Sequence, residues 1–370
     1  MRPFALAFVS SSMWFAGPAL AVAPQEPAPA VVPAVPTPPD PLLLGTGVHQ
    51  YRWVPDFGRL GEGKELGSTH GGVVVARDGT IYANTDTEHA VVGFAPDGRI
   101  VGSWGKEFHG GAHGMCLVVE DGVEFVYLAH TRRHEVVKCS LDGKVVATIG
   151  WPEASGVYDN ETQYLPTAVA VAPDGRIFVA DGYGRSWVHV FDRDRKYTTS
   201  FGGPGSAAGK LQTPHGLWLD PRGKEPLLLV CDRENHRLQW FSLHGDHVRS
   251  LDKGLARPCN VAPLFDGGLA VAELTGRVTI LDREGKVVGR LGEQPDETLR
   301  ATRDVARERW QDGVFHAPHG IAAGADGSLY VLEWNATGRL VKLVPTVPRP
   351  VPPGVPAAPG DGAKPADVPK

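Results

Sequence analysis

A histidine followed by a glycine recurs just ahead of four short apolar segments of this chain, at His70, His113, His215 and His319. The last three are separated by 102 and 104 residues, as equivalent positions of a repeat would be. Three neutral imidazoles that leave one coordination position open form the arrangement of a catalytic zinc site. We therefore predict that His113, His215 and His319 are metal ligands. The simpler interpretation is that they hydrogen-bond backbone groups around a channel.

Turn signals along the chain indicate the repeat that carries these histidines. Asp-Gly or a close relative recurs from 78–79 to 326–327, and each pair favours a tight hairpin because glycine adopts positive φ without strain. The aligned turns define units of roughly 40 to 50 residues, the period of four-stranded propeller blades. The sequence predicts an all-β, six-bladed β-propeller. Its blades begin near His70, His113, Thr167, His215, Cys259 and His319.

The ends of the repeat region indicate how the ring closes. The last unit runs out of strands near Leu343, while residues 48–54 form an unassigned strand before the first unit. We expect this N-terminal strand to complete the sixth blade, because a closed ring leaves no long sheet edge exposed. Residues 297–311 predict one helical segment between blades five and six. Blades two, four and six of such a ring lie about 120° apart, so their histidines can meet at the axis.

The segments that flank residues 45–345, the predicted propeller, differ from it in composition. Residues 1–21 combine Arg2, an apolar stretch and a small-residue end, which is typical of a secretory signal peptide. A retained membrane anchor is less compatible with Pro18, which interrupts the apolar stretch. Residues 22–44 and 346–370 are rich in proline and predict an extended Pro/Ala-rich linker and a disordered tail. We expect a secreted or periplasmic protein without a transmembrane domain after signal cleavage.

Charge and cysteine usage restrict the partners and the scaffold. The net charge of -5 and the lack of a long Lys/Arg run provide no electrostatic footprint for nucleic acid. The four cysteines include no Cys-x-x-Cys pair, so they do not indicate a cysteine-stapled fold. We expect a monomer that acts on a small-molecule or peptide substrate and binds no nucleic acid.

Two sequence motifs in the third and fourth predicted blades, at residues 179–184 and 230–239, look like NHL repeats. Together with the Pro-His-Gly tripeptides at 214–216 and 318–320, they resemble the peptidyl-α-hydroxyglycine α-amidating lyase family over about residues 65–345. The resemblance implies a six-bladed propeller that binds zinc on its axis through three histidines. It also implies a tyrosine that helps cleave an α-hydroxyglycine into an amide and glyoxylate. The matching residues are His113, His215, His319 and Tyr183.

The chain departs from this family pattern at three positions. A family arginine near the start of the domain falls at or beside His70. Gly320 stands where the family has an aspartate that assists a structural calcium ion, and Gly184 stands where it has a disulfide-forming cysteine. The resemblance therefore supports zinc more strongly than it supports calcium or the specific lyase activity.

His70 and Tyr183 are the predicted catalytic residues. His70 holds the repeat position of the histidines in the first blade, where it is either a fourth ligand or a proton carrier beside the metal; a carrier fits the threefold arrangement better. Tyr183 can reach the open metal position and take a proton if a nearby cation lowers its pKa. The alternative for Tyr183 is a packed tyrosine with its hydroxyl on the backbone.

Other polar residues near these positions have two interpretations each. Cys259 holds the axial position of the fifth blade and is either close to the metal or a buried, inert thiol. Arg185, Arg233 and Arg237 either clamp a substrate carboxylate or lie on a solvated blade edge. Asp181 is expected to fix a loop by accepting backbone N–H bonds.

Two functions of different classes follow from these features. The first is a metal-dependent lyase that cleaves a carbon–nitrogen bond of an α-hydroxylated small or peptide substrate. The second is a non-catalytic NHL propeller that serves as a scaffold for a protein, peptide or glycan, since a fold alone does not define a function. A lactonase would need a carboxylate-rich axial calcium site, and the axial positions here are His, Thr and Cys.

Overall fold

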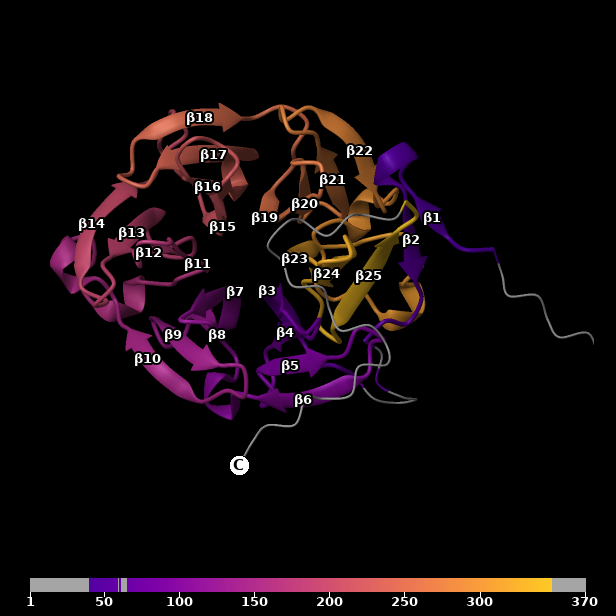
Figure 1. Cartoon of the computed structure of the whole chain (residues 1–370), viewed down its shortest axis with the longest axis horizontal. Coiled ribbons are helices and arrows are strands. Elements are labelled where there is room, and N and C mark those ends of the chain that lie inside the picture. Colours follow the sequence, from indigo (N-terminus) through magenta and orange to yellow (C-terminus); the bar gives the residue numbers. More distant parts are fainter. Residues whose placement is uncertain (1–39, 59, 61–64, 348–370) are drawn as a thin grey trace, which may run out of the picture. The chain divides into compact units, whose positions relative to one another are not determined.

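Six antiparallel β-sheets are arranged as blades around an axis in the computed structural model, which describes residues 40–58, 60 and 65–347 (Figure 1). Blade one contains β3 (Thr69–Val75), β4 (Ile81–Thr85), β5 (Val91–Phe94) and β6 (Ile100–Trp104). Blade two contains β7 (Ala112–Glu120), β8 (Val123–His130), β9 (Glu135–Ser140) and β10 (Val145–Ile149). Blade three contains β11 (Ala168–Val171), β12 (Ile177–Ala180), β13 (Trp187–Phe191) and β14 (Tyr197–Gly202). Blade four contains β15 (Pro214–Asp220), β16 (Leu227–Asp232), β17 (Arg237–Ser242) and β18 (His247–Leu251). Blade five contains β19 (Pro258–Pro263), β20 (Leu269–Glu273), β21 (Arg277–Leu281) and β22 (Val287–Leu291).

The sixth sheet combines strands from both ends of the described chain. It contains β23 (Pro318–Ala323), β24 (Leu329–Glu333), β25 (Arg339–Pro345), β2 (Tyr51–Val54) and β1 (Leu43–Leu44). Strand β2 pairs antiparallel with β25, from Tyr51 opposite Pro345 to Val54 opposite Lys342. The strand predicted over residues 48–54 is shorter than expected because Gly47–His49 forms a 3-10 turn, η1.

The innermost strands contact one another in the cyclic order β3, β7, β11, β15, β19, β23 and back to β3. They begin at or next to the six predicted positions, and the predicted all-β six-bladed propeller is confirmed. The predicted Asp-Gly turns hold their glycines at positive φ, as at Gly79 (85°) and Gly327 (80°). These turns keep each strand short and join neighbouring strands of one blade.

The predicted helix over residues 297–311 is wrong. This segment contains two 3-10 turns, η6 (Glu297–Leu299) and η7 (Arg307–Arg309). Between them Ala301 has a φ of 53°, and its N–H donates to the carbonyl of His316 rather than to a helical neighbour. A short helix needs an apolar face that packs on the core, and Val305 is the one buried residue of the segment.

The remaining 3-10 turns lie in connections between strands. They are η2 (Lys106–Phe108), η3 (Glu153–Ser155), η4 (Glu161–Gln163) and η5 (Arg233–Asn235). No helix in the described part of the chain is long and apolar enough to cross a membrane. The predicted signal peptide at 1–21, most of the predicted linker at 22–44 and the predicted tail beyond residue 347 lie outside the described residues.

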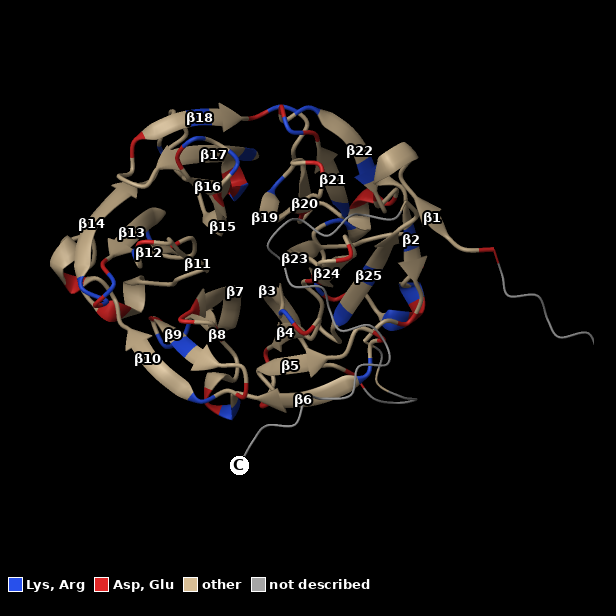
Figure 2. Cartoon of the chain, in the orientation of Figure 1, with Lys and Arg blue, Asp and Glu red and all other residues tan. Residues whose placement is uncertain are grey.

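The hydrophobic core is divided among the six interfaces between neighbouring blades, with one cluster of buried side chains at each. Between blades three and four, for example, Phe178 packs in one cluster with Leu228 and Phe241. Such face-to-face packing of sheets removes apolar surface from water, which stabilises the ring by about 25 cal/mol per Å² buried. Charged residues of both signs are interspersed around the ring, and the innermost strands carry few of them (Figure 2).

The glycine that follows each axial histidine is required because the next blade comes very close. The Gly114 N–H donates to the Thr167 carbonyl, at 3.0 Å between N and O. A Cβ atom on Gly114 would lie 2.3 Å from that carbonyl oxygen, a separation that real Cβ atoms do not reach. The same close approach occurs at Gly216 and Gly320. The repeated His-Gly signature therefore reflects packing of adjacent innermost strands as well as the histidine itself.

We expect Gly114→Ala to lower the free energy of unfolding by about 1–3 kcal/mol, because the added methyl group forces β7 and β11 apart. Gly102→Ala is the matched control, since a Cβ atom there meets nothing within 4 Å. Urea denaturation of both variants measures the difference. Equal midpoints for the two variants would contradict this account of the glycine.

Candidate metal centre

The three predicted metal ligands lie together on the axis of the propeller. His113 is on β7, His215 on β15 and His319 on β23, the innermost strands of blades two, four and six (Figure 1). All three side chains are buried. The ring centroids are 4.3 Å apart for His215 and His319, 4.9 Å for His113 and His215, and 5.2 Å for His113 and His319. The structure therefore brings together residues that are more than 200 positions apart in sequence.

Backbone carbonyls of the next blade orient two of these rings. Nδ1 of His113 donates to the carbonyl oxygen of Thr167 at 2.6 Å, and Nδ1 of His215 donates to that of Cys259 at 3.0 Å. Because Nδ1 carries the proton, Nε2 of each ring keeps a free lone pair, and this is how proteins commonly orient histidine ligands of a metal. Nδ1 of His319 is buried and has no hydrogen-bond partner.

Two overlapping groups of side chains could hold a metal ion. In the part of the chain that the structure describes, the donor atoms of His70, His113 and His319 lie within 4.8 Å of one another, and so do those of His215, Cys259 and His319. The predicted tripod is thus divided between two groups that share His319. Burial lowers the pKa values of all three tripod imidazoles well below the ordinary value. Neutral imidazoles that converge on the axis and an orphaned buried nitrogen fit a bound metal ion.

His70 lies beside this cluster but is offset from the position predicted for it. A β-bulge near the start of β3 inserts two extra residues relative to the neighbouring strand β4. The bulges at the starts of β15 and β23 insert only one residue each relative to β16 and β24. As a result the carbonyl of Gly71 approaches Gly320, just as the carbonyl of Thr167 approaches Gly114. Gly71 therefore occupies the repeat position on β3, and His70 precedes it.

The ring of His70 nevertheless points toward the axis. Its centroid is 4.6 Å from that of His113 and 4.9 Å from that of His319. Burial lowers the pKa of His70 to about 4, against a smaller opposite effect of Asp86. His70 is neutral at physiological pH and can accept a hydrogen bond or a proton.

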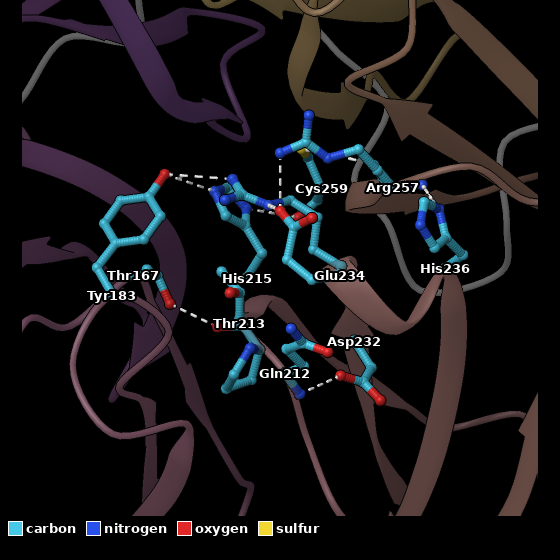
Figure 3. A network of polar contacts seen from close by, with 12 residues as sticks. Thr167, Tyr183, Gln212, Thr213, His215, Asp232, Glu234, His236, Arg257 and Cys259 are labelled. Atoms are coloured by element: carbon cyan, nitrogen blue, oxygen red, sulfur yellow. Dashed lines mark hydrogen bonds and ion pairs between the residues drawn. The ribbon is translucent and has the colours of Figure 1, made fainter. Parts of the chain in front are cut away.

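The phenol of Tyr183 reaches the same point of the axis from the loop after β12. Its oxygen lies 3.0 Å from Nε2 of His215, 3.2 Å from Nε2 of His113 and 3.5 Å from Nε2 of His70. Tyr183 and His215 point toward one another (Figure 3). Since the Nε2 atoms of His113 and His215 carry no proton, either can accept the single hydrogen bond that the phenol donates. The structure thus places the predicted tyrosine within hydrogen-bonding distance of the predicted ligands.

Sequence and structure comparisons identify similar proteins. The NHL repeat family matches residues 164–191, which include Tyr183. Peptidyl-α-hydroxyglycine α-amidating lyase 1 of Drosophila melanogaster is 26% identical over 282 residues, which cover 69% of this chain and 48% of the relative. A probable lyase of the same name from Caenorhabditis elegans is 28% identical over 248 residues, 64% of each chain. The chain resembles the amidating lyases. It spans about half to two thirds of the length of these curated relatives.

A solved streptogramin B lyase has the same fold as this amidating-lyase-like chain. The TM-score is 0.53 at 14% sequence identity, with 76% of this chain and 94% of the other covered. This likeness supports the propeller architecture. The similarity to amidating lyases comes from the sequence comparisons and covers most of the described residues.

The residues around Gly320 do not fit the calcium ion that the amidating-lyase pattern implies. A Cβ atom on Gly320 would lie 2.3 Å from the carbonyl oxygen of Gly71, so an aspartate has no space there. The adjoining axial cavity of about 340 Å³ is lined by apolar residues such as Met115 and Ile321, together with axial histidines, and its described lining includes no Asp or Glu. Calcium requires several oxygen ligands, commonly carboxylates.

Gly184, another of the three departures from the amidating-lyase pattern, makes room for a buried carboxylate. A Cβ atom on Gly184 would lie 2.2 Å from Oδ1 of Asp181. Asp181 accepts hydrogen bonds from the backbone N–H groups of Leu165 (2.7 Å) and Arg185 (2.5 Å). These bonds fix the loop that carries Tyr183, as expected of Asp181.

Of the three arginines considered as carboxylate clamps, Arg233 is the one that reaches the cluster. Its Nη1 lies 3.4 Å from the phenol oxygen of Tyr183. Arg237 instead pairs with Asp232, at 2.7 Å, and Arg185 is an exposed residue 4.0 Å from Asp159.

Burial raises the pKa of Tyr183 to about 12, and the positive charge of Arg233 opposes this shift without overcoming it. The phenol is therefore protonated at neutral pH unless a further cation is bound nearby.

A buried network of hydrogen-bonded side chains lies behind the loop of Tyr183. No sequence motif marks these residues, and sequence analysis did not identify them. The hydroxyl of Tyr158 donates to Oδ2 of Asp181 at 2.6 Å and lies 2.6 Å from Nε2 of His189. Nδ1 of His189 lies 2.7 Å from Oγ of Ser200. Burial lowers the pKa of His189 to about 3, so its imidazole is neutral in the folded protein.

His189 should make the protein sensitive to acid. The unfolded chain protonates this histidine below its ordinary pKa of 6.5, whereas the folded chain does not until about pH 3. The stability contributed by neutral His189 is therefore present above pH 6.5 and lost as the pH falls, by up to about 1.4 kcal/mol per pH unit. We expect the urea midpoint of the wild type to fall more steeply between pH 7 and 4.5 than that of His189→Gln. Parallel pH profiles would show that His189 is not the cause, and His244→Gln, at an exposed position, is the control.

Proposed function

We propose that this chain is an exported, zinc-dependent lyase that cleaves the carbon–nitrogen bond of an α-hydroxylated small-molecule or peptide substrate at the axial cluster. The observation that carries the proposal is the convergence of the Tyr183 hydroxyl on the Nε2 atoms of His113 and His215. The similarity to amidating lyases supports the reaction class. In this proposal residues 1–21 are the signal peptide, residues 22–44 and 346–370 are the linker and tail, and residues 45–345 act as a monomeric propeller.

His113, His215 and His319 would hold the zinc ion. Their buried, neutral imidazoles are in the protonation state that ligation requires. When bound, zinc supplies Lewis acidity that polarises a substrate oxygen. The carbonyls of Thr167 and Cys259 hold two of the rings in the correct tautomer.

Tyr183 and His70 would move the proton. The hydroxyl of the substrate passes its proton to the oxygen of Tyr183 while the phenol passes its own proton to Nε2 of His70, 3.5 Å away, so that Tyr183 stays neutral and His70 becomes protonated. The C–O bond then becomes a carbonyl, the C–N bond breaks, and the departing amide nitrogen takes the proton back along the same path. With an α-hydroxyglycine, the products are a primary amide and glyoxylate, so atoms and charge balance.

Arg233 would pair with the carboxylate of such a substrate. Its side chain lies beside the phenol and is close enough to influence the pKa values of Tyr183 and His70. The planar guanidinium binds carboxylate oxygens in a bidentate manner. This contact would hold the α-carbon next to Tyr183.

The test is to incubate zinc-loaded protein with a peptide that ends in α-hydroxyglycine. We expect equal amounts of peptide amide and glyoxylate, above the spontaneous rate, and loss of the activity after chelation with recovery on adding zinc. If zinc-loaded, folded protein forms neither product above the spontaneous rate, the amidating-lyase proposal fails and the scaffold function takes its place.

A further inference from the structure

Cys259 lies where it can compete for two of the proposed zinc ligands. Its side chain is fully buried on β19, the innermost strand of blade five. Its Sγ and the donor atoms of His215 and His319 lie within 4.8 Å of one another. Figure 3 shows Cys259 next to Arg257, whose carbonyl accepts a weak hydrogen bond from the thiol. A second observation points to a ligand here: Nδ1 of His319 is buried without a hydrogen-bond partner.

The thiol packs against Leu274 and Ala317, and its polar contacts are weak ones with two arginines. It donates a weak hydrogen bond to the carbonyl of Arg257, at 3.7 Å, and the side chain of Arg233 donates to its sulfur. Burial raises the pKa of Cys259 to about 11, while the positive charges of Arg233 and Arg257 act in the opposite direction. The group is thus a protonated thiol close to two imidazoles, and the nearby guanidinium groups favour the thiolate once a metal displaces its proton.

The donor set of this group differs in chemistry from the tripod. Three imidazole nitrogens suit zinc, whereas a thiolate with two imidazoles favours softer cations such as Cu(I) or Cd²⁺. We propose that Cys259, His215 and His319 form a second metal site for a soft, thiophilic cation that overlaps the zinc site. The inference rests on the proposed function, because the two sites share His215 and His319.

Occupation of the two sites is mutually exclusive, since one imidazole nitrogen ligates one ion. Binding of the soft cation at Cys259 releases the thiol proton to solvent and removes two ligands from the tripod. A thiophilic metal would thereby displace zinc and inactivate the site without any change in fold. His113 and His70 belong to the other group and are not needed for the second site.

The experiment uses the full chain, freed of metal and titrated with CdCl2, and follows the ultraviolet charge-transfer band of a cadmium thiolate. We expect the band to saturate at one cadmium per chain in the wild type and to be lost in Cys259→Ser. The matched control is Cys139→Ser, because Cys139 is equally buried but lies in the core between blades one and two. We expect His113→Ala to keep the band while losing zinc.

A second measurement needs no variant and covers the case in which Cys259→Ser does not fold. Zinc-loaded wild type should release one zinc ion for each cadmium bound, as read with a chromophoric zinc indicator, while the thiolate band appears. Zinc binding by the tripod together with no cadmium thiolate band would overturn the second site and leave the proposed function intact. A band that persists in folded Cys259→Ser would equally overturn it, and failure to bind zinc in the first place would overturn the proposed function and with it the overlap of the two sites.

Discussion

Alanine at His113, His215 or His319 should reduce bound zinc from about one ion per chain to a small fraction of that value, because each replacement leaves two imidazoles where a catalytic zinc site needs three protein ligands. Lyase activity should fall with the metal content. The three side chains are buried on the innermost strands of alternate blades, so each replacement removes one donor from the axis. Metal analysis of purified, untagged protein after dialysis against zinc measures the effect.

The control for the histidine variants is His244→Ala, in the exposed turn between β17 and β18. This variant should retain the zinc and the activity of the wild type. Undiminished zinc in any one of the three axial variants would remove that histidine from the tripod. Such a result at His113 alone would point to the group formed by His215, Cys259 and His319 as the primary site.

Phenylalanine at Tyr183 should lower kcat about 100-fold to 10,000-fold with zinc content unchanged, because general acid–base catalysis by one side chain contributes about that factor. The substitution removes one oxygen, which lies within 3.5 Å of three imidazole nitrogens. The loop should keep its position, since Asp181 holds it through backbone N–H groups of Leu165 and Arg185. Steady-state rates of amide and glyoxylate formation measure the change.

Tyr330→Phe is the control, since Tyr330 is a buried tyrosine that packs away from the axis, in the cluster between blades one and six. It should leave kcat unchanged. A Tyr183→Phe variant with the full rate would exclude the phenol from the proton path. Loss of zinc along with the rate would instead assign to Tyr183 a role in shaping the metal centre.

The sequence alone determined the architecture and the identity of the axial residues. Turn pairs such as those at 78–79 and 326–327 define the blades because a hairpin turn depends on the local need for positive φ, which glycine meets. His113, His215 and His319 are two repeats apart. Each repeat forms one blade with one innermost strand, so the three histidines lie on alternate blades. Tyr183 was identified from a short sequence motif that resembles the amidating lyases.

Only the tertiary structure decided which side chains meet at the axis. Arg233 was not distinguishable by sequence from Arg185 and Arg237, because all three follow similar loop segments and the direction of each side chain depends on the blade beside it. The offset of His70 arises from one extra bulge residue in β3, which leaves the local His-Gly pattern unchanged. The absence of a helix over residues 297–311 likewise depends on long-range hydrogen bonds such as that from Ala301 to His316.

The grouping of Cys259 with His215 and His319 is also a property of the ring and not of any segment. Local sequence determines strands and turns, because these depend on backbone conformations over a few residues. Distances between side chains of different blades depend on how six sheets pack around one axis, and packing of this kind is set by all of the interfaces together. The chemistry of the candidate centre is therefore encoded by a few residues, whereas its geometry is determined by the closed ring.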